Sequence, residues 1–127
     1  MKLLDYVNAY QAALTGSDCD ELIQVFQDNI KQNINIALTP KFTQVNVNEV
    51  TPALVQPLAR AALAAYDRYC EDHPETQFLP PPRTLESFRI KRYRSGTDEQ
   101  FKTHIDVANM ESAKRYLAFL FYLNDDF

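Results

Sequence analysis

Three segments in the second half of the chain decide the predicted fold: FRIKRYR (88–94), FKTHID (101–106) and YLAFLFYL (116–123). Each is rich in aromatic or β-branched residues, which favour strands. The third segment is apolar on both alternating faces, as in a strand that is buried on both sides. We therefore predict three β-strands in this half of the chain. A helix over 111–122 is the alternative for the third segment.

The connections between these segments are also marked in the sequence. Ser95-Gly-Thr-Asp98 separates the first two predicted strands, and Gly96 permits the tight turn there. Pro80-Pro-Pro82 cannot continue a helix or lie in a central strand, so we expect a stiff connector at this point.

The first half of the chain is predicted to be mainly helical. Apolar residues recur at helical spacing in three stretches. The first runs from Leu3 to Leu14 and would end at Gly16. The second begins at Asp18, which forms a capping box with Glu21, and ends near Asn33. The third runs from Thr51 to His73, with Pro52 at the first helical position. Between them, Phe42 to Asn48 alternates at Val45 and Val47, which is typical of a half-buried strand.

These elements define an α+β protein with one domain over residues 1–127. We expect a mainly helical support region with one strand over 1–79, a proline-rich connector over 80–86 and a β-core over 87–127. The length of 127 residues and the balance of 46% hydrophobic and 24% charged residues suit one globular domain.

Composition argues against two classes of partner. The chain has 13 Lys and Arg against 17 Asp and Glu, a net charge of -4, so we expect no nucleic acid partner. The longest apolar run, 116–123, is far shorter than the roughly 20 residues of a membrane helix, so we expect no membrane span. The N-terminus is a poor secretory signal, and Cys19 and Cys70 are interpreted as reduced core thiols, which favours the cytoplasm.

His104 and Asp106 are the residues whose pattern suggests chemistry. On an extended strand, residues two apart project to the same face, so an imidazole nitrogen and a carboxylate oxygen would converge. Such a pair supplies two corners of the 2-His-1-carboxylate arrangement that holds non-haem Fe(II). Alone, a His-x-Asp triplet is a weak signal, because a strand histidine beside an exposed aspartate has the same pattern.

Three motifs together carry more information: Tyr93-Arg-Ser-Gly96, Phe101-Lys-Thr-His-Ile-Asp106 and Tyr122-Leu-Asn-Asp125. In this order and with these gaps, the chain resembles the prolyl-4-hydroxylase-like branch of the Fe(II)/2-oxoglutarate-dependent dioxygenases over about residues 18–127. The resemblance implies a double-stranded β-helix, or jelly roll, of about eight strands, of which 87–127 is the first half.

The resemblance also implies a role for four residues. His104 and Asp106 match the first two iron ligands, and Tyr93 and Tyr122 match tyrosines of the 2-oxoglutarate pocket. No catalytic residue is implied beyond the metal ligands. An ordinary core tyrosine is the alternative at both tyrosine positions. Alternation also places Tyr93 on one strand face with Arg89 and Lys91, so that face is polar inside the barrel or a bulge shifts the register.

The implied activity is hydroxylation of a C–H bond. The implied cofactors are Fe(II) and 2-oxoglutarate, with ascorbate as an optional addition, and dioxygen is consumed with 2-oxoglutarate. The implied substrate is peptidyl-proline or another small molecule. Four basic residues make a local cluster that is a solvated strand face or a surface steering an acidic substrate: Arg89, Lys91, Arg92 and Arg94.

The sequence departs from the family pattern after Asp106. It has no later histidine, and its only later basic residues, Lys114 and Arg115, come too early for the family's 2-oxoglutarate ligand. We therefore expect an oxygenase half-domain that is inactive alone. The alternative is a catalytically inactive interaction or oligomerisation module, and for either we expect a homo-oligomer or partner covering the Tyr116–Leu123 edge. A structural metal completed by a second chain is a third hypothesis.

Overall fold

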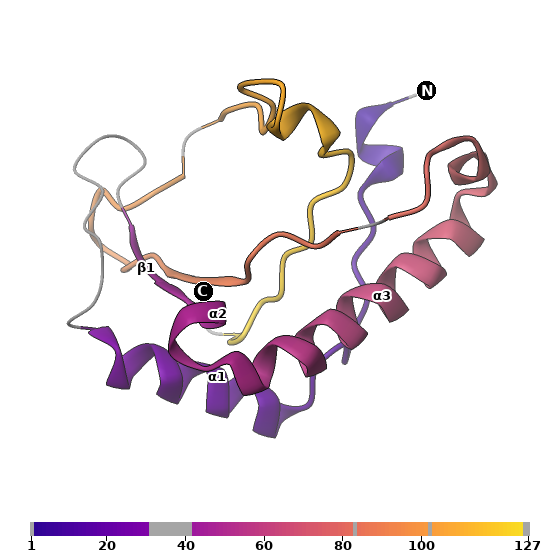
Figure 1. Cartoon of the computed structure of the whole chain (residues 1–127). Coiled ribbons are helices and arrows are strands. Elements are labelled where there is room, and N and C mark those ends of the chain that lie inside the picture. The colour runs from indigo at the N-terminus through magenta and orange to yellow at the C-terminus, as the bar shows by residue number, and fades with distance from the viewer. Residues whose placement is uncertain (1, 31–41, 83, 102, 126–127) are drawn as a thin grey trace.

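A computed structural model describes residues 2–30, 42–82, 84–101 and 103–125 (Figure 1). Its main elements are helix α1 (Gly16–Asp28), strand β1 (Thr43–Asn46), the short helix α2 (Val47–Val50), helix α3 (Val55–Asp72) and strand β2 (Arg89–Arg92). Shorter 3-10 turns lie at Leu3–Tyr6, Pro52–Leu54, Pro74–Phe78 and Ser112–Lys114. The mixture of helix and strand confirms the predicted α+β class.

The capping box of helix α1 lies three residues earlier than predicted. Thr15 Oγ1 accepts a hydrogen bond from the Asp18 backbone N–H at 3.1 Å, and the Asp18 carboxylate accepts one from the Thr15 N–H at 2.8 Å. The box is therefore Thr15/Asp18 rather than Asp18/Glu21, and Gly16 begins α1 instead of ending an earlier helix. The hydrogen bond that the Thr15 hydroxyl donates to the Asp18 carboxylate at 2.6 Å, together with that from the Thr15 N–H, holds the pKa of Asp18 below its usual value.

The apolar spacing predicted one stripe of four residues on this helix: Leu22, Ile23, Phe26 and Ile30. Leu22 and Phe26 are buried, Ile23 is half-buried, and Ile30 is 40% exposed, so the stripe is confirmed in part. The predicted end of this helix near Asn33 lies outside the described residues.

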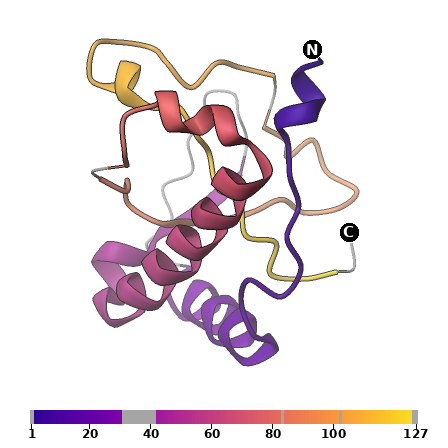
Figure 2. The ribbon, with the colours of Figure 1, turned by 90° about the vertical axis from the view of Figure 1, so that its right-hand side faces the viewer.

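The predicted helix from Leu3 to Leu14 is wrong beyond its first turn. After the 3-10 turn Leu3–Tyr6 the chain lies against the end of α3 (Figures 1 and 2). Asn8 Nδ2 and the Tyr10 hydroxyl donate to the Asp72 carboxylate at 2.8 Å and 2.7 Å. The segment therefore forms side-chain hydrogen bonds to α3 in place of its own helical backbone bonds.

The centre of the fold is the point where β1 becomes α2. The two strands pair antiparallel with Val45 opposite Ile90. Directly after β1, Val47 has no exposed surface, and its backbone N–H donates to the Phe88 carbonyl at 2.9 Å. The Phe88 N–H in turn donates to Asn48 Oδ1 at 2.8 Å. These two bonds fix the start of β2 to the corner between β1 and α2.

The hydrophobic core is built around this corner. Leu22 of α1 and Leu58 of α3 pack with Val47. Half-buried apolar residues surround this cluster: Leu14, Leu54, Val55, Phe88, Ile90, Phe121 and Leu123. Helices α1 and α3 cross on one side of the sheet (Figures 1 and 2). The C-terminal segment, drawn in yellow in Figure 1, runs toward α2. No helix in the described ranges has the length and apolar character needed to cross a bilayer.

Two of the three strands predicted after the proline connector are wrong. Only β2 forms, within the predicted 88–94 range, whereas 101–106 and 116–123 contain no strand among their described residues. The alternative helix over 111–122 is also wrong, since only the turn Ser112–Lys114 is helical there.

The segment 116–123 nevertheless keeps the side-chain pattern of a strand. Four alternate residues are half-buried, and the residues between them are exposed; the half-buried ones are Leu117, Phe119, Phe121 and Leu123. Within the described ranges, no backbone hydrogen bond joins residues 117–121 to another segment. The predicted burial on both sides is therefore wrong, because one face is half-buried and the other is exposed. A strand also needs a neighbouring backbone.

Replacement of core residue Leu58 by alanine tests this description. Leu58 is 5% exposed and Leu63, on the same helix, is 44% exposed. We expect Leu58→Ala to lower the free energy of unfolding by about 2–5 kcal/mol, because it removes buried apolar surface and leaves a cavity. Leu63→Ala is the matched control and should change it by less than about 0.5 kcal/mol. Chemical denaturation measures both, and equal losses would contradict this core.

Candidate functional site

A tight turn leads from β2 to the candidate site. Gly96 has φ +70°, in the left-handed region that glycine occupies without strain. The Glu99 carboxylate accepts hydrogen bonds from the Arg94 backbone N–H at 2.7 Å and from Arg94 Nε at 2.8 Å, which ties the two ends of the turn together. The predicted turn over Ser95–Asp98 is confirmed, and Arg94 holds the pKa of Glu99 below its usual value.

Aromatic rings on either side of the turn bring two predicted site residues together. The buried Phe42 ring lies 5.6 Å from the Tyr93 ring and 5.5 Å from the Phe101 ring, centroid to centroid. The Phe101 ring lies 3.9 Å from the imidazole of His104. We call Phe42 and Phe101 the aromatic platform. Tyr93 and His104 contact it from different segments, so the structure places them in one cluster.

His104 and Asp106 converge although they do not lie on a strand. His104 Nε2 and Asp106 Oδ1 are 3.0 Å apart, and the side chains are 41% and 54% exposed. Two metal ligands at right angles, each about 2.1 Å from the ion, are also separated by about 3 Å. The pair therefore suits adjacent corners of one first-row metal, and an ion would replace the bond that now joins them. Among the described residues, no group of three or more His, Cys, Asp or Glu could hold a metal.

Arg115 supports the backbone at Asp106. Its guanidinium donates to the Asp106 carbonyl at 2.8 Å and forms an ion pair with the carboxylate of Glu86, in the proline-rich connector. Glu86 raises the pKa of Arg115 above its usual value. Arg115 thus positions the backbone of Asp106. Sequence reasoning missed this role because it considered Arg115 only as a ligand of 2-oxoglutarate.

A buried serine shapes the chain that follows Asp106. Ser112 Oγ accepts hydrogen bonds from the backbone N–H groups of Ala108 and Asn109 at 2.8 Å and 2.9 Å, and the Ser112 N–H donates to Asn109 Oδ1 at 2.9 Å. These bonds give the backbone N–H groups of the turn their hydrogen-bond acceptors and hold the turn that precedes Arg115.

The second predicted tyrosine lies apart from this cluster. Tyr122 is 71% exposed on the outward face of the C-terminal segment, which it shares with Ala118 and Leu120. Tyr93 contacts the aromatic platform, and burial raises the pKa of its phenol. Phe42 is the platform residue that sequence reasoning did not single out, because its aromatic partners Tyr93 and Phe101 lie in a distant stretch of the sequence.

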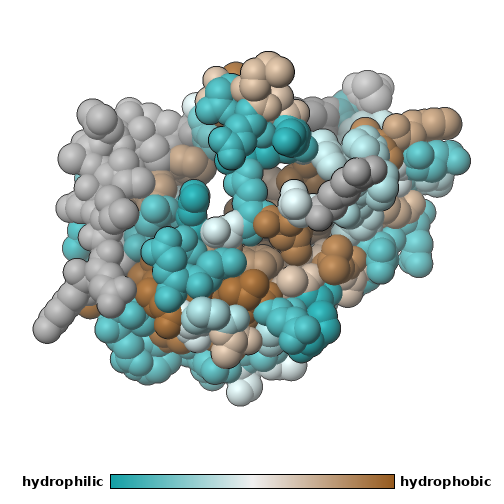
Figure 3. All heavy atoms as spheres, viewed as in Figure 1, coloured by the Kyte–Doolittle hydropathy of each residue, from teal (hydrophilic) through white to brown (hydrophobic). Residues whose placement is uncertain are grey.

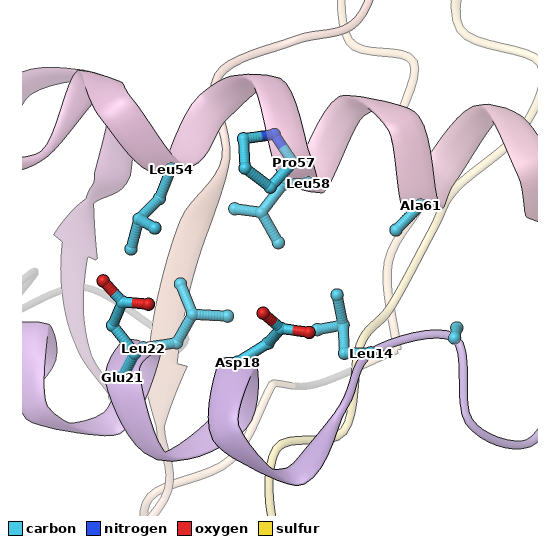
Figure 4. A pocket seen from close by; sticks show the side chains of 9 residues that line it. Leu14, Asp18, Glu21, Leu22, Leu54, Pro57, Leu58 and Ala61 are labelled. Carbon is cyan, nitrogen blue, oxygen red and sulfur yellow. The ribbon is translucent and has the colours of Figure 1, made fainter.

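A separate pocket lies between α1 and α3 (Figure 4). It has a volume of about 100 Å³, with Leu22, Leu54 and Leu58 lining it and the carboxylates of Asp18 and Glu21 directed toward it. None of the residues predicted to bind iron or 2-oxoglutarate lines this pocket. The candidate site is therefore the exposed cluster around His104.

Comparison with known proteins found no matching family model, no matching curated protein and no matching solved structure.

The turn before the site can be tested by adding a methyl group at each of the two glycines. Neither Gly96 nor Gly16 has atoms near a new Cβ, but only Gly96 has a positive φ. We expect Gly96→Ala to lower the free energy of unfolding by roughly 1–2 kcal/mol, the cost of a left-handed L-residue. Gly16→Ala, at the start of α1, should leave it unchanged or raise it by about 0.4–1 kcal/mol. Thermal unfolding of the two variants decides, and equal effects would contradict the assigned turn.

Proposed function

We propose that this chain carries part of the iron site of an Fe(II)- and 2-oxoglutarate-dependent oxygenase of the prolyl-4-hydroxylase-like kind, with His104 and Asp106 as two of the ligands. The observation that carries the proposal is the 3.0 Å separation of His104 Nε2 and Asp106 Oδ1 on an exposed surface. An imidazole nitrogen and a carboxylate oxygen are the donor types of the 2-His-1-carboxylate site. The third ligand and the strands that complete a jelly roll would come from outside the described residues.

The residues around the pair have defined roles in this proposal. Iron, when bound, would supply the chemistry by which dioxygen oxidises 2-oxoglutarate to succinate and carbon dioxide and hydroxylates a C–H bond, with peptidyl-proline or another small molecule as substrate. Phe101 packs against the His104 ring and limits its orientations, and Arg115 fixes the backbone that carries the Asp106 carboxylate. Tyr93 would contribute a phenol to the 2-oxoglutarate pocket, beside the aromatic platform. Tyr122 would join it only after the C-terminal segment pairs as a strand.

Metal binding by the isolated chain tests the ligand assignment. We expect Mn(II), a probe for Fe(II), to bind more weakly than micromolar, because two protein ligands leave most coordination positions to water. His104→Ala and Asp106→Ala should each abolish this binding, whereas His73→Gln, at the other histidine, should not. Calorimetry and the electron paramagnetic resonance signal of free Mn(II) measure the affinity. Micromolar or tighter binding that survives His104→Ala would refute the assignment.

A second function, self-association through the C-terminal segment, is favoured by a different observation. Residues 117–121 have alternating burial and no backbone partner within the described ranges, and Leu120 on their outward face is 78% exposed. In the view of Figure 3, apolar surface lies at the centre of the molecule, around the C-terminal segment and α3. An extended segment of this kind is open to pairing with a strand of another chain.

Charge substitution at Leu120 tests self-association. We expect the chain to behave as a dimer or larger oligomer in size-exclusion chromatography with light scattering, and Leu120→Lys to shift it to the monomer, because a buried ammonium opposes pairing. Leu4→Lys is the matched control, since Leu4 is 77% exposed, and it should leave the oligomer intact. A monodisperse monomer for the unmodified chain would exclude this function.

A further inference from the structure

Lys91 lies on the strand face that carries the candidate site. In β2, Ile90 and Arg92 are half-buried, and Ile90 packs against the core. Lys91 is exposed on the opposite face, and Tyr93 follows two residues later on that face. Arg89 and Lys91 therefore share the exposed face with Tyr93, as the sequence pattern predicted, and β2 pairs with β1 without a bulge.

The ammonium group of Lys91 lies against the aromatic platform. Lys91 Nζ is 4.9 Å from the centroid of the Phe42 ring and 4.5 Å from that of the Phe101 ring. Phe42 also contacts Tyr93, and Phe101 contacts His104. A cation, a phenol and the candidate metal ligand therefore border the same two rings.

The charge of Lys91 is only partly compensated. Its amine has no carboxylate within ion-pair distance in the part of the chain that the structure describes. Although the residue as a whole is exposed, partial desolvation of its ammonium group against the rings lowers the pKa of Lys91, as does repulsion from Arg89, and attraction to Asp106 opposes them. A partly desolvated cation without an ion pair gains more from a bound anion than a fully hydrated lysine does.

We infer that Lys91 is the anion-binding residue of this site and pairs with a carboxylate of a small dicarboxylate ligand bound next to His104 and Asp106. The inference rests on the proposed function and deepens it, because it assigns the cation to β2 rather than to the chain after Asp106. Tyr93 lies beside Lys91 and donates a hydrogen bond to the same carboxylate. The aromatic platform keeps water from one side of the ion pair and fixes the position of the ammonium group.

A chemical-shift titration of the 127-residue chain with 2-oxoglutarate, without metal, tests the inference. We expect millimolar binding that shifts resonances of Lys91, Tyr93 and Phe101, and no binding of the neutral dimethyl ester. Lys91→Met keeps the aliphatic contacts with the rings and should weaken binding at least about tenfold, the loss expected for a charge-assisted bond. Lys91→Arg should retain most of the affinity, and Lys114→Met, at an exposed lysine of the Ser112–Lys114 turn, should retain all of it.

Mn(II) binding to the same variants separates this inference from the proposed function. We expect Lys91→Met to leave it unchanged, because Lys91 does not coordinate the metal. Unaltered 2-oxoglutarate affinity in folded Lys91→Met, or no binding to the unmodified chain up to tens of millimolar, overturns the role of Lys91 and leaves the metal ligands standing. If 2-oxoglutarate binding depends on Lys91 but Mn(II) binding is unchanged in His104→Ala, the metal site is refuted and the anion site stands. If Lys91→Met fails to fold, the affinity of Lys91→Gln decides by the same criterion.

Discussion

The fold depends on the burial of Val47 at the corner between β1 and α2. Its side chain has no exposed surface, and its N–H donates to the Phe88 carbonyl, so one residue joins the helical half of the chain to the start of β2. Leu22 and Leu58 reach this point from α1 and α3. Because a closely packed interior tolerates little change in volume, the positions of both helices and of the sheet are coupled there. The candidate site, with Lys91 on β2 and Tyr93 directly after it, takes its position from the same corner.

Sequence reasoning succeeded where local signals and burial agree. The stripe of Leu22 and Phe26, the helix that became α3 and the glycine turn at Gly96 each follow from spacing or backbone freedom within a few residues. It failed at the N-terminus, where the apolar spacing is helical but Asn8 and Tyr10 bond to Asp72. A pattern within one segment holds no information about such distant partners.

The C-terminal segment shows a different limit. Its residues are apolar on both alternating faces, which predicted burial on both sides, but only the face with Phe121 and Leu123 packs against the core. A strand, however, is a property of two backbones, and the sequence of one segment cannot specify the other. For the site, the spacing of His104 and Asp106 predicted that the two side chains converge, but their convergence here comes from an irregular segment. The supporting contacts of Phe42 and Arg115 bridge long stretches of sequence and could not be read from it.

The Arg115 guanidinium links the proline-rich connector to the backbone of Asp106, through Glu86 on one side and a carbonyl on the other. Both side chains of this ion pair are substantially exposed, so dissolved salt screens their attraction. The geometry of the candidate ligand pair is consequently linked to ionic strength: dilute buffer keeps the connector and the Asp106 loop together, and concentrated salt lets them separate while the core around Val47, held by apolar contacts, stays intact.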